Sequence, residues 1–557
     1  MSRSQHGCRA FALALASLAL AHCASAPPAI EPISYQRGES TIRLAFLGRY
    51  TMGFFGTGGA VPAAFDPQTR RLFVVNADRG WVDAVDIADP AAPNLVRRQV
   101  LLGYGFPQSI ALSRGILAVA FSSFIDTLPG KVLFFDTEGK RFGDIVRVGA
   151  KPVQLRFTPD GGKLVVVNHG EANDSYTIDP EGTISIIDLG IEDADCRGAA
   201  CAIRPRVAQL DFRSLNDQET ALRREGVRIY GPDASVAQDL EPEAVAIAPD
   251  GGTAWVSLQR NNAMAVIDLT SERIARIFAL PTKDHGRPGA GFDGSSADGA
   301  INIRPWPVEG LYMPDIFEAY EVAGETFLVT PNEGDPREST AFVEEARLRT
   351  LTLDPEVFPN ALMLQQDGNL GRLRVSAVDG DLDGDGALDR IFSYGGRSFA
   401  IWTGEGELVF DSGDDLEQIM AEAVPSCFNC SGGSIRFDER SDARGPEPEA
   451  LALGRIDGRD YVFIEPERIG GIYVYDITDP RAPVFQQYVN YRDLSVDPSQ
   501  VCEAKQPVTE ACAAAGDLEP EGVLFIAAEG SPIGVPLVVL THELSTSATI
   551  WRVDQVR

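Results

Sequence analysis

Residues 445–480 read GPEPEALALGRIDGRDYVFIEPERIGGIYVYDITDP, in which short apolar runs alternate with turn residues. The runs are Ala450–Gly454, Tyr461–Ile464, Gly471–Tyr475 and, just beyond, Val484–Val489. Asp457-Gly458 is typical of a tight hairpin turn between the first two. Because β-branched and aromatic residues favour strands, the stretch predicts four short antiparallel strands in about 45 residues.

The same unit recurs along the chain, with a proline before its first strand and an aspartate at the end of its third. The prolines are Pro62, Pro107, Pro152, Pro242, Pro314, Pro448 and Pro520, and the aspartates are Asp86, Asp136, Asp188, Asp268, Asp476 and Asp554. One such sheet cannot bury both faces until neighbours stack on it. The recurrence therefore predicts an all-β fold, a seven-bladed β-propeller whose four-stranded blades are similar to YVTN and WD repeats.

We expect one propeller domain over residues 40–557, with loop insertions near 190–240 and 336–396. Helices are expected at Asn216–Arg224, Phe342–Arg349 and Asp415–Val424. The last blade has only three strands of its own. Thr41–Arg49 is the expected fourth strand, and it would close the ring and remove exposed sheet edges.

Residues 1–26 have the pattern of an export leader: two arginines, the apolar run FALALASLALA and a small-residue stretch. The run is too short to span a bilayer. LAHC at 20–23 is similar to a lipoprotein cleavage motif, although His22 stands where a small residue is usual. Lipidation of Cys23 and ordinary cleavage both stay open. We expect a periplasmic, outer-membrane-anchored or secreted protein that contacts membrane only through such an anchor.

The chain is strongly acidic, with 80 Asp and Glu against 49 Lys and Arg and a formal charge of -31. Such a surface repels nucleic acid and anionic lipid and attracts divalent cations. Nucleic acid is therefore excluded as a partner. Much of the acidic excess can equally serve solubility alone.

Six cysteines follow the leader as three near pairs, each in a loop outside the expected strands: Cys196/Cys201, Cys427/Cys430 and Cys502/Cys512. In an exported protein this spacing favours local disulfides over metal or redox chemistry at the single CFNC motif.

VDGDLDGDGALDRIF contains Asp381, Asp383, Asp385 and Asp389 at the spacing DxDxDGxxD. That spacing folds oxygen ligands around one hard cation, and a glycine allows the sharp turn. The twelfth position is Phe392, so the glutamate of a full EF-hand loop is missing. We expect a calcium site; the alternative is a solvated acidic turn.

An acidic residue follows the opening proline in four of the seven units: Glu243, Asp315, Glu449 and Glu521. First strands line the axis of a propeller, so these side chains are expected to converge on one funnel mouth. Four close carboxylates cannot all stay ionised without a partner. Calcium, another divalent cation or iron would neutralise them; the alternative is pairing with arginines such as Arg444. Glu241, Glu447 and Glu519 would form a second tier.

Catalytic motifs are much weaker. The chain has no GxSxG, HExxH or P-loop, and only His169, His285 and His542 follow the leader. His169 and His542 end second strands and are the candidates for a catalytic histidine, against the alternative that each satisfies a loop carbonyl.

Several long motifs resemble the choice-of-anchor I family, whose members are similar to mesenchyme-specific cell-surface glycoproteins and in bacteria are often labelled alkaline phosphatase. They are SDARGPEPEALALG (441–454), ERIGGIYVYDITDP (467–480), PNEGD (331–335), GDLDGDGALDRIFSYGGRSFAIW (380–402) and DLEPEGVLFIAAEGSPIGVPLVVLTHE (517–543). The chain departs from the family at His542, where Asn is usual.

Two functions stay open at this point. The first is an exported calcium-binding propeller that presents loops for extracellular matrix or other ligands. The second is a metal-dependent phosphoesterase acting on phosphate-containing ligands in the funnel. Propellers support both kinds of function.

Overall fold

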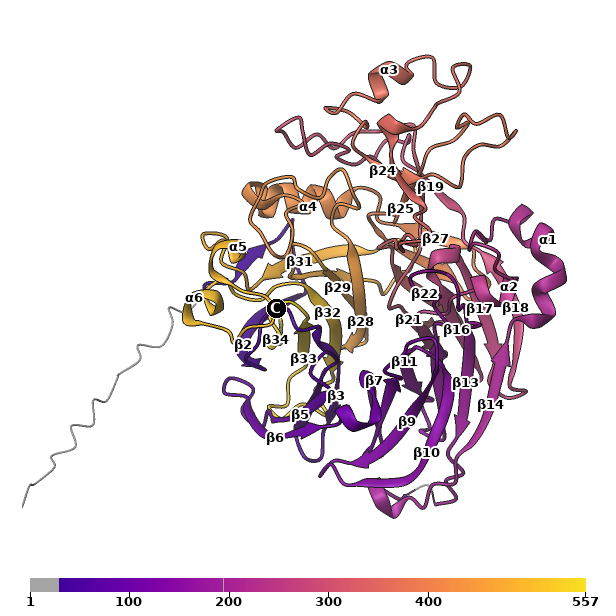
Figure 1. Cartoon of the computed structure of the whole chain (residues 1–557). Helices are drawn as coiled ribbons and strands as arrows, with labels where there is room; N and C mark the ends of the chain where they lie inside the picture. Colours follow the sequence, from indigo (N-terminus) through magenta and orange to yellow (C-terminus); the bar gives the residue numbers. More distant parts are fainter. Residues whose placement is uncertain (1–29, 194, 557) are drawn as a thin grey trace, which may run out of the picture.

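The computed structural model describes residues 30–193 and 195–556, which form an all-β fold. The expected leader and the lipidation candidate Cys23 lie outside the described residues. The described residues form eight sheets, and seven of these contain a four-stranded antiparallel blade. Figure 1 shows the sheets arranged around a common centre.

The first four blades have their strands in chain order. Blade one has β3 (Gly59–Asp66), β4 (Arg71–Asn76), β5 (Trp81–Asp86) and β6 (Asn94–Val100); blade two has β7 (Phe106–Ser113), β8 (Ile116–Ser122), β9 (Pro129–Asp136) and β10 (Arg141–Ala150). Blade three has β11 (Pro152–Phe157), β12 (Lys163–Asn168), β13 (Thr183–Asp188) and β14 (Arg206–Asp211); blade four has β15 (Val245–Ile247), β16 (Thr253–Leu258), β17 (Ala263–Asp268) and β18 (Arg273–Ala279).

The last three blades carry additions. Blade five has β21 (Glu318–Val322), β22 (Glu325–Pro331), β26 (Phe399–Thr403) and β27 (Leu408–Asp411), with the largest insertion between its second and third strands. Blade six has β28 (Pro448–Ile456), β29 (Arg459–Pro466), β30 (Ile472–Asp476) and β31 (Val484–Asn490), and β1 (Ile33–Tyr35) extends its edge. Blade seven has β32 (Pro520–Ile526), β33 (Leu537–His542), β34 (Ser547–Gln555) and β2 (Ile42–Thr51).

The expected pairing of the N-terminal strand with the last blade is confirmed. β2 runs antiparallel to β34, with Ile42 opposite Gln555 and Thr51 opposite Ser547. The two ends of the described chain thus share one sheet, and the last blade gains the fourth strand that its own sequence lacks.

The core lies between blades. Successive residues of a strand point to opposite faces, so Leu72 and Phe73 on β4 enter different clusters. Leu72 packs with Val539 of blade seven, and Phe73 packs with Leu117 of blade two. Seven clusters of this kind each join two neighbouring blades. Because both faces of each blade are covered, the strands are near-continuous apolar runs instead of strict alternations.

The first strands β3, β7, β11, β15, β21, β28 and β32 contact one another in this order, and β32 contacts β3. Strands β3, β7, β11, β21, β28 and β32 line a cavity of about 450 Å³, whose walls include Ala63, Ile110, Leu155, Leu451 and Val523. This arrangement places the heads of the first strands around one axis, which is what positions the candidate site.

The eighth sheet combines two strands from the connection between blades four and five with three strands from the blade-five insertion, and it projects at the top of Figure 1. Its strands are β19 (Thr282–Asp284), β20 (Glu309–Leu311), β25 (Phe392–Tyr394), β24 (Arg374–Ser376) and β23 (Glu345–Arg347), in this spatial order. It has its own core, which includes Phe292, Trp306, Leu348, Leu370 and Val375.

The prediction of a helix at Phe342–Arg349 is wrong. Glu345, Ala346 and Arg347 form β23 and pair with Ser376, Val375 and Arg374. A segment this short has little helical stability of its own, so the long-range backbone pairing determines its conformation.

The helices are short. The α-helices are α1 (Glu219–Arg224), α2 (Val236–Asp239), α3 (Ala361–Leu364), α4 (Asp415–Ala423), α5 (Pro498–Val501) and α6 (Glu510–Ala513), and the 3₁₀ turns are Leu102–Tyr104, Gly198–Ala200, Arg213–Gln218, Gln259–Asn261, Leu348–Thr350 and Pro425–Cys427. The helices expected at Asn216–Arg224 and Asp415–Val424 are thereby confirmed. Across the part of the chain that the structure describes, no helix is long and apolar enough to cross a membrane.

The three expected cysteine pairs are confirmed as disulfides. Cys196 is bonded to Cys201, Cys427 to Cys430 and Cys502 to Cys512, with Cα–Cα distances of 5.0, 5.1 and 4.8 Å. All three close loops outside the blade strands, where each reduces the freedom of the unfolded loop.

We expect no free thiol among these six cysteines in the protein purified without reductant. Alkylation without reductant, followed by intact-mass measurement, should add no label to them, whereas reduction before alkylation should add six. Two or more labels in the unreduced sample would contradict the disulfide assignment.

Candidate metal centre

The four acids that follow the opening prolines lie at the heads of the first strands. Glu449 and Glu521 are the second residues of β28 and β32, whereas Asp315 and Glu243 precede β21 and β15 by a few residues. Glu449 is buried and the other three are partly buried. Asp315 lies close enough to Glu243 and Glu449 to interact with both electrostatically. Glu521 interacts in the same way with Glu449 and Asp315. The structure thus brings the four predicted residues together.

Further acids join them from the ends of second strands. Glu333 follows β22, Glu467 follows β29 and Glu543 follows β33. Carboxylate oxygens approach within 4.8 Å of one another in three trios that share members: Asp315, Glu333 and Glu449; Glu333, Glu447 and Glu467; and Glu467, Glu519 and Glu543. We call these residues, with Glu243 and Glu521, the axial cluster.

Glu447 in this cluster is fully paired with arginines. Its carboxylate lies 2.5 Å from Arg440, 3.2 Å from Arg444 and 3.0 Å from Arg468. Burial opposes ionisation, yet the three guanidinium groups together hold the pKa of Glu447 below its usual range. For this residue of the expected second tier, pairing with arginine is the correct interpretation.

Glu241 is held in the same way at the other side of the cluster. Its carboxylate lies 3.3 Å from Arg260, 3.6 Å from Arg337 and 3.4 Å from His169. Glu519 lies 3.5 Å from Arg468. All three residues of the expected second tier, Glu241, Glu447 and Glu519, therefore form salt bridges with arginines.

Three of the four acids after the opening prolines, Asp315, Glu449 and Glu521, have a different environment, and we call these three the first tier. The fourth, Glu243, is paired with His169. Across residues 30–193 and 195–556, no Arg, Lys or His nitrogen lies within 4.0 Å of the carboxylates of Asp315, Glu449 or Glu521. Burial raises the pKa of all three well above the usual range, and the neighbouring carboxylates raise it further. Burial, opposed by Arg444 and reinforced by nearby acids, raises the pKa of Glu333 to about 7.

Carboxylate oxygens without hydrogen-bond partners occur in Glu449, whose carboxyl group otherwise shares a hydrogen bond with Asp315, and in Glu465, at the end of β29. Glu449 Oε2 and both carboxylate oxygens of Glu465 are buried and have no hydrogen-bond partner in the described structure. A buried carboxylate without partners is costly, so it must be protonated or neutralised by a bound cation.

The donor set fits a hard cation. Calcium binds oxygens at about 2.3–2.6 Å, which places opposed ligands about 5 Å apart. The trio of Asp315, Glu333 and Glu449 lies within that span. The trio offers no imidazole or thiolate, which zinc would prefer. These residues can thus hold calcium or another cation that prefers oxygen ligands.

The cluster adjoins the central cavity. Ile316, Leu451 and Gly522 line that cavity, and each follows a first-tier acid by one or two residues. A small anion in the cavity could therefore approach a cation held by the first tier.

Neither candidate histidine has the environment of a general base. His169 Nδ1 lies 2.5 Å from Glu243 and its Nε2 lies 3.4 Å from Glu241. Burial disfavours its protonation, but Glu243 and Glu241 outweigh burial and raise the pKa of His169 to about 9. His542 Nε2 lies 3.1 Å from Thr549 Oγ1, and burial lowers its pKa to about 4. At neutral pH the first is a paired imidazolium and the second a neutral core residue.

The Asp381–Asp389 loop lies between β24 and β25, away from the axial cluster. Carboxylate oxygens of Asp381, Asp383 and Asp385 lie within 4.8 Å of one another, and all three side chains are exposed. Asp381 accepts hydrogen bonds from the backbone N–H groups of Gly384 (2.7 Å) and Gly386 (3.0 Å).

Asp389 is the fourth predicted ligand, and its carboxylate accepts the N–H of Leu382 at 2.8 Å. It is not part of the close trio. Phe392, at the twelfth position, begins β25 and is only 7% exposed. Its role in the core explains why no glutamate stands there.

The family model of the choice-of-anchor I domain matches residues 62–480, which contain six of the seven opening prolines and most of the axial cluster. The chain belongs to the choice-of-anchor I domain family. The resemblance to this family that the long sequence motifs indicated is therefore confirmed.

Two curated proteins are similar over part of their length. Gigasin-3a of Magallana gigas is 39% identical over 118 residues, which is 20% of this chain and 41% of that protein. The mesenchyme-specific cell surface glycoprotein of Strongylocentrotus purpuratus is 26% identical over 259 residues, which is 40% of this chain and 33% of that protein. The chain thus spans less than half the length of either relative.

Among solved structures, the hydrazine synthase of Kuenenia stuttgartiensis has 13% identity and a TM-score of 0.43, with 90% of this chain and 97% of that chain covered. A streptogramin B lyase has 9% identity and a TM-score of 0.44, with 93% and 100% covered. The β-propeller domain of Myceliophteria thermophila Cps50 has 10% identity and a TM-score of 0.39, with 92% and 99% covered. Likeness at this level says nothing of function.

The paired histidine makes a testable prediction about pH. The folded-state pKa of His169 lies above its usual 6.5, so its stabilising effect is complete below pH 6.5 and is lost as the pH rises through about 9. The shift corresponds to roughly 3 kcal/mol. Urea unfolding should show His169→Gln much less stable than the parent at pH 6.5 and closer to it at pH 9.5.

His542→Gln is the matched control, because burial lowers the folded-state pKa of His542 from 6.5 to about 4. Its pH-dependent effect on stability therefore falls mainly below pH 6.5 and should change little over this window. A His169→Gln deficit that does not shrink with pH would contradict the imidazolium assignment.

Proposed function

We propose that the protein is an exported, calcium-binding propeller of the choice-of-anchor I family whose loops bind extracellular ligands. In this proposal the seven four-stranded sheets are the seven blades of one closed ring. Support comes from the cyclic contacts of the first strands and from the seven apolar clusters, each shared by two neighbouring sheets.

An extracellular or cell-surface location is supported by the three disulfides, by the family and by the cell-surface glycoprotein among the relatives. Within that location we propose export through the leader at residues 1–26, followed by release or by anchoring through Cys23. Phosphate-containing or matrix ligands remain the proposed partners, because a cation held by carboxylates at the funnel can leave a coordination position open to an anion.

The observation that carries the metal proposal is the missing counter-charge of the first tier. Asp315, Glu449 and Glu521 are gathered by three different blades, and within the described residues none of them forms an ion pair with Arg, Lys or His. The second tier next to them is well supplied with arginines. The fold thus neutralises one tier with side chains, and we propose that a divalent cation neutralises the other.

A phosphoesterase activity is the second candidate. Overlapping trios that share Glu333 and Glu467 offer oxygen donors for more than one cation, and the 450 Å³ cavity adjoins them. Cations held there would polarise a phosphoryl oxygen and supply a metal-bound water as nucleophile. Arg444 and Arg468 border the cluster and could orient an anionic substrate.

The axial site is tested by Glu449→Gln with Glu521→Gln. The double variant should lose bound metal, measured by plasma mass spectrometry. Without metal its Tm should exceed that of the metal-free parent, because two buried carboxyl groups that either repel their neighbours or must take up protons are replaced by neutral amides. Added calcium should raise its Tm less. Glu225→Gln with Glu356→Gln, two exposed glutamates, is the control.

If metal content, both Tm values and hydrolysis of phosphomonoesters and phosphodiesters all match the parent, the axial cluster holds no metal. If the parent and the control bind metal equally and neither hydrolyses these substrates, the metal-binding function is supported and the phosphoesterase proposal is contradicted.

The exposed loop is tested separately. Carboxylates at Asp381, Asp383 and Asp385 repel one another until a cation neutralises them, so Asp383→Ala with Asp385→Ala should lower calcium stoichiometry and reduce the Tm loss on chelation. Asp126→Ala with Asp144→Ala, two exposed aspartates outside the loop, should behave as the parent. Unchanged stoichiometry and chelator response would identify the loop as a plain acidic turn.

A further inference from the structure

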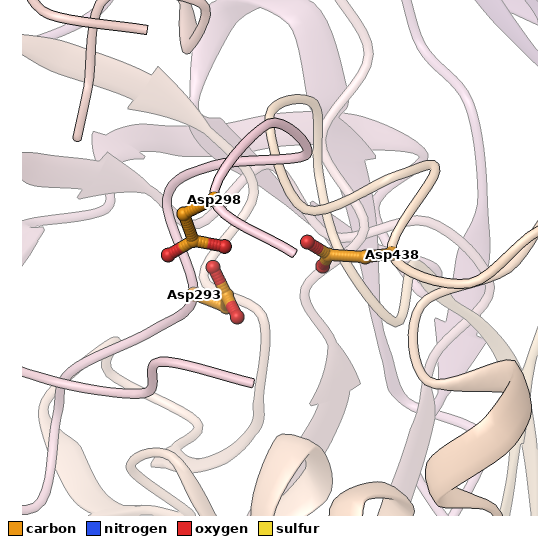
Figure 2. A group of neighbouring side chains, drawn as sticks. All are labelled: Asp293, Asp298 and Asp438. Carbon is orange, nitrogen blue, oxygen red and sulfur yellow. The ribbon is translucent and has the colours of Figure 1, made fainter. Parts of the chain in front are cut away.

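A second group of buried acids lies where two distant loops meet. Asp293 and Asp298 belong to the connection between β19 and β20, and Asp438 belongs to the loop after the Cys427–Cys430 disulfide. Carboxylate oxygens of the three approach within 4.8 Å of one another. Figure 2 shows Asp293 and Asp298 side by side, with the carboxylate of Asp438 directed toward them from the other loop.

Asp438 supplies the observation that points to a ligand. It is 1% exposed, and one of its oxygens accepts a hydrogen bond from the Ser441 hydroxyl. The other, Oδ2, is buried and has no hydrogen-bond partner in the described structure. A carboxylate oxygen left unpartnered in the interior and aimed at two more carboxylates requires a proton or a cation.

Asp293 is fully buried and is already oriented by the backbone. Its two oxygens accept the N–H groups of Ser295 at 3.2 Å and of Asn302 at 2.6 Å. Asp298 is exposed and accepts the N–H of Ala300 at 3.1 Å. The 293–302 loop is therefore folded around its two carboxylates, and each carboxylate keeps lone pairs free for a further partner.

No basic side chain within the described ranges forms an ion pair with these three acids. Arg397 is nearby, but its Nη1 lies 2.8 Å from Glu417, with both side chains almost completely buried. Arg397 also donates to the carbonyls of Asp293, at 3.0 Å, and of Ser441, at 2.8 Å. The arginine thus holds the two loops together, while its charge is neutralised by Glu417.

The carboxylates of Asp293, Asp298 and Asp438 therefore lack a positive counter-charge, as do those of the first tier of the axial cluster. Burial raises the pKa of Asp438 to about 8 and that of Asp293 to about 6, and the neighbouring acids contribute to both. Three carboxylates with this spacing and these unused lone pairs form one side of an oxygen coordination shell.

We propose that Asp293, Asp298 and Asp438 bind a divalent cation, best calcium, that joins the β19–β20 connection to the loop after Cys430. Calcium fits because the donors are all oxygens, are spread over up to 4.8 Å and come from loops, whereas magnesium requires a tighter octahedron and zinc prefers nitrogen or sulfur. Backbone carbonyls and water complete the shell. The exposed Asp298 is the side from which the ion enters.

The test measures hydrogen exchange of the full chain with calcium and with chelator. In the parent, calcium should slow amide exchange in residues 290–303 and 434–443. Asp438→Asn, which keeps the side-chain shape, should remove this protection and about one equivalent of calcium. Asp298→Asn changes an exposed residue and should weaken the protection without affecting folding.

Asp284→Asn, an exposed aspartate on β19, is the control and should keep the protection. The axial variant Glu449→Gln with Glu521→Gln should keep it too, so failure of this site and failure of the axial site are distinguishable. Absence of calcium-dependent protection in the parent, or protection that survives both Asp438→Asn and Asp298→Asn, would overturn the proposal.

Discussion

Each blade of this protein has two apolar faces, and neither can be left in water. Leu72 and Phe73, adjacent on β4, bury themselves against different neighbouring blades, and the same holds around the whole set of sheets. A row of such sheets has no exposed apolar face only if the last packs on the first. The β2–β34 pairing and the contact of β32 with β3 meet that condition.

The cyclic packing has an electrostatic consequence. It brings the heads of the first strands together, so any charge carried there is concentrated on one axis. Glu447 and Glu241 are compensated by arginines, but Asp315, Glu449 and Glu521 are not. Removing several carboxylates from water without a counter-charge costs more free energy than most single packing interactions supply. In our account a bound cation offsets this cost and stabilises the buried carboxylates at neutral pH.

The sequence was informative where one unit repeats. The position after each opening proline predicted that Glu243, Asp315, Glu449 and Glu521 converge, because the register of a repeated sheet fixes which residue heads the strand. Glu333 and Glu467 were not predicted as members of the cluster. They lie just after second strands, the same position in the repeat for which His169 and His542 were considered as catalytic candidates. The common signal was a polar residue just beyond an apolar second strand.

Outside the repeat, prediction from sequence was weaker. The eighth sheet joins β20 to β25 across about 80 residues and pairs β23 with β24, and no local pattern indicates such contacts. The same pairing explains why the expected helix at Phe342–Arg349 is absent. Asp438 and Asp293 are likewise brought together only by the tertiary fold, and neither has the spacing of a recognisable motif.

The central claim is that Asp315 and Glu449 of the first tier, together with Glu333, hold a cation. Anomalous diffraction from crystals grown with manganese or calcium tests it most directly, because the signal locates the ion independently of stability or activity. The account predicts an anomalous peak within bonding distance of Asp315, Glu333 and Glu449. An empty position, with the carboxyl groups of these residues hydrogen-bonded to one another, would contradict it.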